Sequence, residues 1–508
     1  MSKYLLAHDI GTSGNKATLF STEGDLIKSK TVSYEAHYFH DTWVEQEAED
    51  WWEAVCRSSK ELICDAGIEA KEIAAVSFSG QMMGCLCVDK EGRPLRPSII
   101  WADSRAQKQV QQIEKKISQK DYYHISGHRN TASYGIQKLM WIRDNEPETY
   151  KKTYKVFNAK DYIVFKLTGN FYTEPSDANS FGCFDLKEFK WSDRILDCTG
   201  INGEKLPEIV PSTYIAGTVT RKAAAKTGLA EGTPVVMGGG DGVVANIGCG
   251  SIAPGKTYCC MGTSAWITTT AKQPIFDEEM RTVTWAHVIP GLYAPNGTMQ
   301  YAGGSFSWVK NTICSMESEM AKMMEASPYD YMNQQVAKSA IGAGGVIFLP
   351  YMLGERAPRW NPYAKGAWLG MKPENTRGDL LRSVLEGITM NLCICLDILR
   401  TKTKIEEITV VGGGARSEVW QQIMADVYDA KIKVPRLLEE GGAMGAAVIG
   451  GVGAGIYRDF SAIEHFIRID KVQIPDRDSV EKYKRIKDIF DKYYFALEDV
   501  FERIYKVD

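Results

Sequence analysis

The sequence predicts an α/β protein built from two domains of similar architecture. At 508 residues the chain is longer than one hydrophobic core usually organises, so two or three domains are expected. Short β-rich runs alternate with helical stretches along most of its length, which is typical of α/β folds. A strand–Gly-Thr-Ser–strand unit also occurs twice, at Gly11 and at Gly262, which are separated by nearly half of the chain. A repeat at that spacing indicates a duplicated domain.

The composition is that of an ordinary globular chain. Hydrophobic residues make up 44% and charged residues 24%, and the net charge is -4, which gives no electrostatic reason to expect nucleic acid as a partner. No basic-then-apolar leader and no apolar run of membrane-spanning length occurs, so we expect a cytoplasmic protein with no membrane partner. The 12 cysteines include no C-x-x-C pair, which favours reduced core cysteines over a zinc site.

The first Gly-Thr-Ser loop lies in a predicted three-stranded meander. Its strands are expected at Tyr4–Ile10, Lys16–Phe20 and Leu26–Tyr34. A loop of this composition can aim several backbone N–H groups and hydroxyls at one anion. Taken alone, a plain hairpin turn is the stronger interpretation.

The second Gly-Thr-Ser loop favours an anion-binding role over a plain hairpin turn. Strands are expected at Lys256–Met261 and Trp266–Thr270, on either side of Gly262-Thr263-Ser264. In this copy Cys260 takes the position that Asp9 has in the first, so only the first loop offers a carboxylate that could hold a metal ion. Two phosphate loops, one from each half, are therefore predicted.

The remainder of the first half alternates between helices and strands. Asp103 follows a predicted strand, where it could bind a polar substrate, cap a helix beginning at Ser104, or do both. The other elements expected here are a helix at Gln46–Gly67, a strand at Ile73–Ser79, a strand at Cys85–Val88 that pairs across a turn at Asp89–Gly92, and a helix at Lys138–Asp144.

The stretch Pro234–Gly250 carries the most distinctive turn of the chain. A short buried strand runs into three glycines, then Asp241, then a helix of small residues. Because glycine permits unusual backbone shapes and close approach to a ligand, Asp241 could be presented in a cleft. On the local sequence alone, a tight turn in which Asp241 is only the helix N-cap is the favoured interpretation.

The second half repeats the alternation of strands and helices. Gly412–Ser417 follows a predicted strand and could hold a nucleotide against glycine backbone. The other features expected are a helix opened by Ala302–Ser305, a buried strand at Gly345–Met352, a polar loop at Gly354–Gly366, a long amphipathic helix at Arg377–Arg400, a strand at Ile408–Val411, a closely packed helix at Gly441–Ile456 and a surface-facing helix at Ser479–Tyr505.

Two nucleotide-binding motifs match in letters but not in context. Gly250–Thr257 fits the Walker A pattern, yet a helix precedes it and a strand follows, the reverse of a P-loop. Gly240–Ala245 fits the G-x-G-x-x-A dinucleotide variant, but no acidic residue occurs between Asp241 and Asp277 to bind a ribose. Neither a P-loop nor a Rossmann site is predicted.

Signature segments give the chain a family resemblance that runs nearly from end to end. Gly366–Met371, followed by Asp379-Leu380 and Ser383–Glu386, matches the second signature of the FGGY carbohydrate kinases in full. Lys138–Ile142 matches the first signature, which departs at Gly135, where Pro, Ser or Thr is usual. Among subfamilies the chain is most similar to xylulokinases, through the segments Trp43–Gln46, Gly80–Met82, Gly354–Arg356 and Gly412–Ser417.

The resemblance implies two actin/hexokinase-like (RNase H-like) domains with an ATP and sugar cleft between them. The N-terminal domain, 1–248, would supply the sugar side, the first phosphate loop and the catalytic carboxylate. The C-terminal domain, 249–508, would supply the second phosphate loop and the adenosine site. The partners implied are ATP, Mg²⁺ and a small sugar, and a homodimer is an assembly that stays open.

The resemblance also implies a role for individual residues. Asp241 would be the catalytic base and, with Asp9, would lie at the metal. The ATP site would comprise Gly11, Thr12, Ser13, Lys16, Gly262, Thr263, Gly303, Ser307, Trp308, Gly413, Gly414 and Ser417. The sugar side would comprise Gln81, Met82, Met83, Asp103 and Asp241.

The activity implied is ATP-dependent phosphorylation of a primary hydroxyl of a small sugar, with D-xylulose as the first candidate and D-xylulose 5-phosphate as its product. Xylulokinases usually carry Gln-Met-His-Gly where this chain has Gln81-Met82-Met83-Gly84, and that His commonly contacts the sugar. Ribulose, another ketose, or a polyol such as erythritol or glycerol therefore stay open as substrates. An actin- or Hsp70-like ATPase and a catalytically silent sugar sensor are the remaining alternatives.

Overall fold

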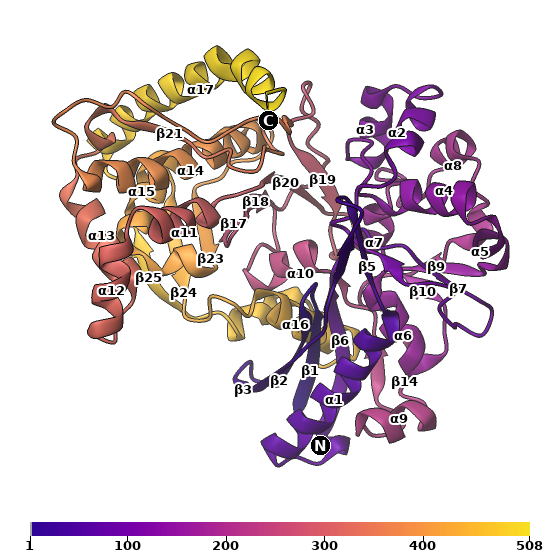
Figure 1. Ribbon diagram of the computed structural model, residues 1–508. Helices are drawn as coiled ribbons and strands as arrows, with labels where there is room; N and C mark the ends of the chain where they lie inside the picture. The colour runs from indigo at the N-terminus through magenta and orange to yellow at the C-terminus, as the bar shows by residue number, and fades with distance from the viewer. Residues whose placement is uncertain (1–2, 508) are drawn as a thin grey trace.

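Two seven-stranded sheets organise the protein, one in each half of the chain (Figure 1). The structure is a computed structural model and describes residues 3–507. The first sheet runs β14 (Ile215–Thr218), β15 (Pro234–Val236), β6 (Ile73–Gly80), β1 (Tyr4–Ile10), β2 (Gly14–Ser21) and β3 (Leu26–Ser33), with β16 (Gly239–Gly240) also paired to β6. The second sheet runs β19 (Val283–Ala286), β20 (Tyr293–Met299), β18 (Ala265–Thr269), β17 (Thr257–Met261), β23 (Glu407–Val411), β24 (Lys431–Pro435) and β25 (Ile469–Gln473).

The two sheets share one plan. In each, an antiparallel meander (β1–β2–β3 or β17–β18–β20) is followed by a strand parallel to its first member (β6 or β23). A further parallel strand (β15 or β24) and an antiparallel edge strand (β14 or β25) follow in both sheets, and β16 in the first sheet and β19 in the second lie outside this shared plan. The predicted duplication is confirmed, and both Gly-Thr-Ser loops lie in the first turn of their meander, after β1 and after β17.

Short strand pairs and helices surround these sheets. The minor pairings join β4 (His37–Phe39), β5 (Trp43–Gln46) and β8 (Ser98–Ile99); β7 (Leu86–Val88) and β9 (Lys155–Phe157); β10 (Tyr172–Thr173) and β13 (Glu208–Ile209); β11 (Phe184–Asp185) and β12 (Lys190–Trp191); and β21 (Ile347–Leu349) and β22 (Ala367–Leu369). The helices of the first half are α1 (Ala48–Ala66), α2 (Gln107–Glu114), α3 (Gln119–Ser126), α4 (Gly135–Asn145), α5 (Pro147–Lys152), α6 (Ala159–Thr168), α7 (Pro175–Ser180), α8 (Asp193–Thr199), α9 (Arg221–Thr227) and α10 (Asp241–Gly248). Those of the second half are α11 (Gly303–Thr312), α12 (Ser315–Met323), α13 (Pro328–Lys338), α14 (Arg377–Arg400), α15 (Glu418–Tyr428), α16 (Gly441–Gly453) and α17 (Arg477–Tyr505).

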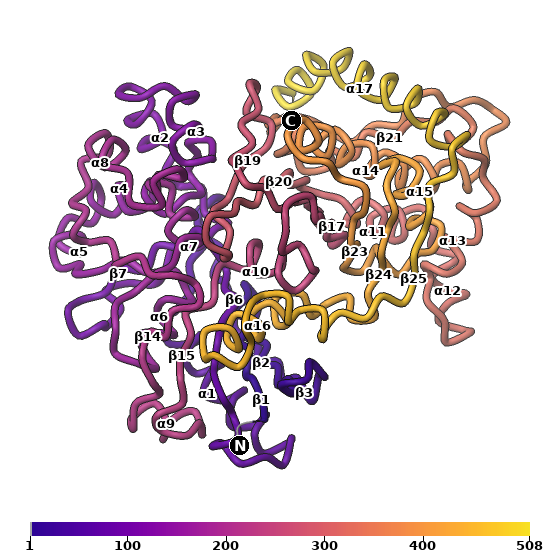
Figure 2. Tube along the Cα trace, turned by 180° about the vertical axis from the view of Figure 1, so that it is seen from behind, coloured from indigo at the N-terminus to yellow at the C-terminus, as the bar shows by residue number. Residues whose placement is uncertain are grey.

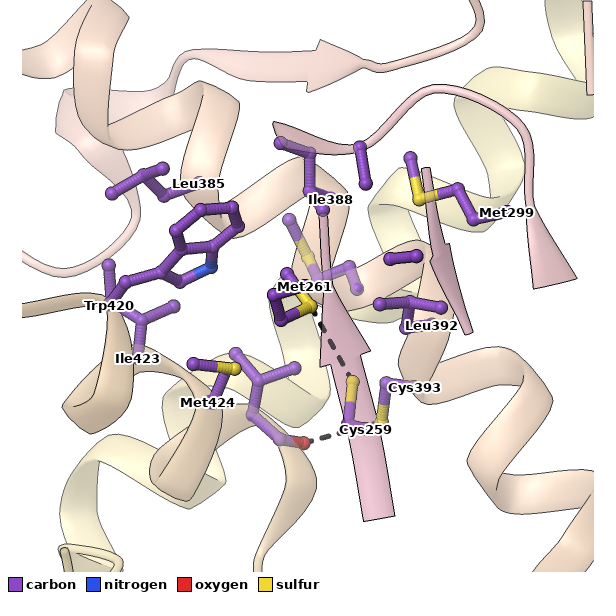
Figure 3. Close-up of a cluster of buried hydrophobic side chains, with 14 of the residues drawn as sticks. Cys259, Met261, Met299, Leu385, Ile388, Leu392, Cys393, Trp420, Ile423 and Met424 are labelled. Carbon is purple, nitrogen blue, oxygen red and sulfur yellow. Dashed lines mark hydrogen bonds between the residues drawn. The ribbon is translucent and has the colours of Figure 1, made fainter. Parts of the chain in front are cut away.

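Helix α14 forms over the predicted residues because its first turn is well capped. The Thr376 side chain accepts the Asp379 N–H, and the Asp379 carboxylate accepts the Thr376 N–H, so two otherwise unpaired donors are satisfied. Its inward residues then pack against the second sheet and α15. Figure 3 shows this core, in which Leu385, Ile388 and Leu392 of α14 surround Met261 of β17. The hydrophobic core of the second half therefore includes β17, the strand that leads into the second Gly-Thr-Ser loop.

Helix α16 returns from the second half to cover the first sheet (Figures 1 and 2). Its small residues allow an unusually close crossing with α10: a Cβ at Gly445 would lie 2.2 Å from the Val244 carbonyl oxygen, and one at Gly248 would lie 1.8 Å from that of Gly441. Alanines of α16 share one buried cluster with Leu5 and Ala7 of β1. The closely packed helix expected here is confirmed, and residues 441–453 lie with the first sheet although they follow residue 248.

Several local expectations differ from the structure. Strand β7 pairs with β9, and the expected pairing across Asp89–Gly92 takes the form of two isolated bridges, Cys85 to Ile99 and Val88 to Pro94, in place of a regular ladder. No helix begins at Ser104, since the chain makes a turn there and α2 starts at Gln107. By contrast, the expected surface-facing terminal helix is confirmed as α17, which buries one face through Tyr483, Phe490 and Phe501 and leaves the other exposed.

The Walker-like segment Gly250–Thr257 connects α10 to β17, in the order that its context predicted. Within residues 3–507, none of the helices has the length and apolar character that crossing a membrane would require.

Candidate active site

A cavity of about 480 Å³ lies where the two halves meet. The first half contributes Asp9, Met82, Met83 and Asp241, and the second contributes Trp285, Asn296 and Arg356. Gly441 and Gly442, at the start of α16, also line it. The cavity therefore collects side chains from both sheets and from the helix that joins them.

Asp241 reaches this cavity because the glycines before it allow a sharp turn. Gly238 has a φ of 71°, and a Cβ there would lie 2.0 Å from the Phe78 carbonyl oxygen, so no other residue fits without displacing β6. A Cβ at Gly240 would meet the Met82 side chain at 2.6 Å. The N-cap position of α10 belongs to Gly240, and the Asp241 carboxylate accepts only the adjacent Gly242 N–H. The helix-cap interpretation of Asp241 is therefore wrong, and its carboxylate faces the cavity.

The electrostatics of the cavity favour a proton acceptor that works near neutral pH. The Asp241 carboxylate is open to the cavity but enclosed by its walls. This restricted hydration and the negative charge of Asp9 raise the pKa of Asp241 to about 7. Asp9, at the end of β1, accepts a hydrogen bond from the Ser79 hydroxyl at 2.8 Å, and burial raises its pKa as well. Two carboxylates thus share one site.

The first Gly-Thr-Ser loop lies at the edge of this cavity. Gly11 lines it, and the carbonyl oxygen of Gly11 accepts the Tyr34 hydroxyl at 2.6 Å. The Thr12 hydroxyl accepts the indole N–H of Trp101 at 2.8 Å, while the Ser13 side chain is exposed. Lys16 forms an ion pair with Glu440, the residue immediately before α16.

A second pocket of about 390 Å³ lies in the second half. It brings together Gly262, Thr263, Gly303, Ser307, Gly413, Gly414 and Ser417, which are the second-half residues expected at the nucleotide with one exception. That exception is Trp308, which packs beside Trp368 with ring centroids 6.0 Å apart and does not line the pocket.

The start of α11 holds the second Gly-Thr-Ser loop in place. The N–H groups of Ala302 and Gly304 both donate to the Thr263 carbonyl oxygen, and the Gly303 N–H donates to that of Gly262 at 3.0 Å. A Cβ at Gly303 would lie 2.5 Å from the Gly262 carbonyl oxygen, so this close approach depends on glycine. Phe306, Tyr329 and Trp420 supply apolar walls for a flat ligand.

The residues expected on the sugar side divide into two groups. Met82 and Met83 line the cavity, and Met83 adopts a left-handed backbone with a φ of 60°. Lys138 fixes that turn from behind, because its buried ammonium donates to the Met83 and Ile100 carbonyl oxygens at 2.8 and 2.7 Å. Gln81 is buried behind the wall, where its side-chain amide donates to Gln46 at 2.8 Å.

Asp103 lies away from the cavity. It is fully buried, one of its oxygens accepts the Val44 N–H at 2.6 Å, and Arg105 binds the carboxylate at 2.7–3.1 Å. Both oxygens of the Asp103 carboxylate therefore accept hydrogen bonds within the protein. Asp103 neither lines the cavity nor caps a helix.

Several cavity residues escaped the sequence-based expectation. Trp101, Trp285, Asn296 and Thr298 line it from segments that read as plain strand or loop. Arg356 is more informative, because its half-buried side chain lines the cavity, its buried Nε has no hydrogen-bond partner, and no ion pair forms with it within residues 3–507. The sequence signals were its place in a polar loop beside Glu355 and in the Gly354–Arg356 segment shared with xylulokinases, neither of which indicated a role at the site.

Two duplicated α/β domains, each with a Gly-Thr-Ser hairpin, and a carboxylate pair where they meet define the class of two-domain actin/hexokinase-like kinases. Residues 4–248 match the model of the FGGY family of carbohydrate kinases, N-terminal domain, and residues 257–454 match that of the C-terminal domain. The chain belongs to the FGGY family of carbohydrate kinases, and it is a phosphotransferase with an alcohol group as acceptor.

Individual relatives differ in the sugar that they are named for. The chain is 32% identical to a xylulose kinase of Staphylococcus epidermidis, over 100% of this chain and 97% of the relative. It is 26% identical to the solved gluconate kinase from Lactobacillus acidophilus, with a TM-score of 0.91 and 99% of both chains covered. The solved ligand-bound xylulose kinase from the same organism is also 26% identical, with a TM-score of 0.91, and the match covers 99% of this chain and 100% of the other. FGGY kinases use ATP as phosphoryl donor, but these similarities leave the sugar undecided.

Proposed function

We propose that this protein transfers the γ-phosphoryl group of ATP to a primary hydroxyl of a small sugar, with D-xylulose as the first candidate and D-xylulose 5-phosphate as the product. The observation that carries the proposal is the placement of Asp241 and Asp9 in one cavity beside the first Gly-Thr-Ser loop. The xylulose kinases among the relatives support the choice of sugar.

Asp241 would act as the general base. Phosphoryl transfer needs little covalent help, so positioning, charge neutralisation and a base near the attacking hydroxyl supply most of the rate. A carboxylate whose pKa is about 7 is partly ionised at neutral pH and remains basic enough to accept the hydroxyl proton.

The phosphates would lie between the two Gly-Thr-Ser loops. Backbone N–H groups and hydroxyls of Thr12 and Ser13 from the first loop, and of Thr263 from the second, are available for anionic oxygens. Lys16 would exchange its ion pair with Glu440 for a phosphate oxygen. The adenosine would occupy the second pocket, against Gly413 and Gly414.

Asp9 and Asp241 would hold Mg²⁺, which supplies neutralisation of the phosphate charge. No cluster of three or more His, Cys, Asp or Glu side chains suited to a metal occurs within residues 3–507. Two carboxylates nevertheless fit Mg²⁺, since this ion usually keeps several waters and takes its remaining ligands from substrate phosphates. The Asp9 oxygen that does not bind Ser79 lies beside Gly442, where a Cβ would come within 3.2 Å of it.

An aldonate such as D-gluconate is the second candidate, and Arg356 is the observation that favours it. Its guanidinium faces the cavity with a buried, unpartnered Nε and no ion pair, and a substrate carboxylate would satisfy it with two parallel hydrogen bonds. A neutral ketose would offer only hydroxyl oxygens to the same group.

A coupled ADP-release assay with D-xylulose, D-ribulose, D-gluconate, erythritol and glycerol, with and without Mg²⁺, tests the proposal. We expect one sugar to raise turnover strongly, and Asp241→Asn to reduce it by about 10²-fold or more while ADP still binds. Preference for D-gluconate that disappears in Arg356→Met would establish the second candidate. ADP release that none of these compounds stimulates would refute both candidate substrates.

A further inference from the structure

A short helix of the first half touches both the turn that carries Asp241 and the turn that carries Met83. Helix α7 spans six residues, and Ser176 to Ser180 are all buried. The Ser176 hydroxyl accepts the Gly240 N–H at 2.9 Å, and the Ser180 hydroxyl accepts the Met83 N–H at 3.0 Å. Because these serines are four residues apart, they lie on one face of α7, one helical turn from each other.

The first contact belongs to a network that grips both ends of the glycine turn. Ser176 donates to Glu174, whose other carboxylate oxygen accepts the Ser212 hydroxyl at 2.7 Å. The Ser212 carbonyl oxygen in turn accepts the Gly238 N–H at 3.0 Å. Glu174 is thus connected to Gly238 and to Gly240, the two ends of the segment that presents Asp241.

The second contact holds a backbone that would otherwise relax. Met83 has a left-handed conformation, which is unfavourable for a residue with a side chain, and it persists only where the surroundings impose it. Ser180 binds the N–H of this residue and donates to the Asp177 carbonyl oxygen at 2.9 Å.

Buried charges fix α7 itself. The Lys160 ammonium lies 2.7 Å from Asp161, 3.1 Å from Asp177 and 3.9 Å from Glu174, and all four side chains are buried. Charges in such surroundings tolerate little displacement, because any loss of a partner leaves an uncompensated ion.

We propose that α7 is a template that sets the position of the Asp241 carboxylate relative to the sugar wall at Met82 and Met83, with Ser176 and Ser180 as its positioning residues. This inference rests on the proposed function, in which Asp241 is the base and the methionines contact the sugar. The two hydroxyls have separate consequences: Ser176 governs the alignment of the base, and Ser180 governs the shape of the sugar site.

Replacing each serine with alanine separates these roles. Misplacing a catalytic group by about 1 Å can cost about 10²-fold in rate, so Ser176→Ala should lower kcat about 10- to 100-fold with KM for the sugar within about twofold. Ser180→Ala should raise KM for the sugar about fivefold or more with kcat nearly unchanged, because binding and not proton transfer is disturbed. KM for ATP should stay constant in both.

Thr227→Val is the matched control. Thr227 is also fully buried, donates to the Ala223 carbonyl oxygen at 2.9 Å and accepts the Leu229 N–H at 3.2 Å, but it lies at the end of α9 and does not line either pocket. The Tm of the Thr227→Val variant should fall by about as much as that of the two serine variants, while its kcat and KM should stay unchanged. Serine variants that behave like this control, or that change kcat and KM identically, would overturn the template.

The outcome for the wild type keeps the two proposals apart. If wild-type turnover depends on sugar and on Asp241 but the serine variants keep wild-type kcat and KM, the role of α7 as a template is refuted and the proposed function is not. A wild type that no sugar stimulates would refute the proposed function, and the template with it.

Discussion

Asp9 and Asp241 come from different segments of the first half and face the same cavity, where the charge of Asp9 contributes to the raised pKa of Asp241. Each carboxylate therefore affects how readily the other ionises. The pairing explains how a residue with an ordinarily acidic side chain could hold a proton near neutral pH.

The first prediction concerns the pH dependence of turnover. Asp241 accepts a proton only when it is ionised, so kcat/KM for the sugar should fall as the pH drops below the pKa of its carboxylate. That pKa is about 7 without a metal, and bound Mg²⁺ should lower it. Initial rates between pH 4.5 and 9, with Mg²⁺ and ATP saturating, measure this, and a profile with no acidic limb over that range would contradict the assignment of Asp241 as the base.

The second prediction concerns stability. Because the pKa of Asp241 is higher in the folded than in the unfolded protein, its ionisation opposes folding, and this cost is complete only above about pH 7. Asp241→Asn should raise Tm at pH 8 and raise it less at pH 5, while turnover is lost. Differential scanning fluorimetry at the two pH values tests this, and an equal or lower Tm at pH 8 would speak against it.

The third prediction separates two neighbouring glycines of the nucleotide pocket. A Cβ at Gly413 would meet nothing within 4 Å, so Gly413→Ala should leave Tm unchanged but project a methyl group into the pocket. ATP affinity should fall about tenfold, or about 1.4 kcal/mol. Gly414→Ala should instead lower stability by about 1–3 kcal/mol, because its Cβ would lie 2.8 Å from that of Met261.

Calorimetric titration with ADP and urea unfolding distinguish these two effects. If Gly413→Ala binds ADP as tightly as the wild type, the nucleotide does not lie against this turn.

The fourth prediction concerns buried His8. Burial lowers the pKa of His8 to about 4, so the folded protein keeps it neutral while the unfolded chain binds a proton below about pH 6.5. The stability that His8 contributes is thus complete above pH 6.5 and is lost as the pH falls toward 4. At about 1.36 kcal/mol per pKa unit, the loss is at most about 3 kcal/mol.

Urea unfolding of the wild type and His8→Gln at pH 7.5 and pH 5 checks this point. The free-energy gap between them should shrink at pH 5. A gap that stays constant would exclude a neutral buried His8.

Local chemistry made much of the fold predictable. The turn residues at Gly11 and Gly262 and the capped first turn of α14 act within a few residues, so the two meanders and the long helix could be placed from sequence. The sharp turn before Asp241 could be predicted from its glycines in the same way. The structure explains one of them, because the backbone at Gly238 permits no side chain.

Contacts between distant segments were not predictable in this way. Asp103 follows a strand as a ligand residue would, but the Val44 N–H and the Arg105 guanidinium occupy its carboxylate. Arg356 shows no periodic pattern, and its exposure to the cavity appears only when the two halves are brought together. Trp308 shares a helix with Ser307 but faces Trp368, a consequence of how α11 packs.

The return of α16 to the first sheet has a consequence for dissecting the protein. The polypeptide passes between the halves three times, after α10, before α16 and again between α16 and β25, so a single cut near residue 248 would not release an intact first half. Such a fragment would expose the apolar surface formed by Leu5, Ala7 and Val244, and it should aggregate unless residues 441–453 are supplied as a separate peptide.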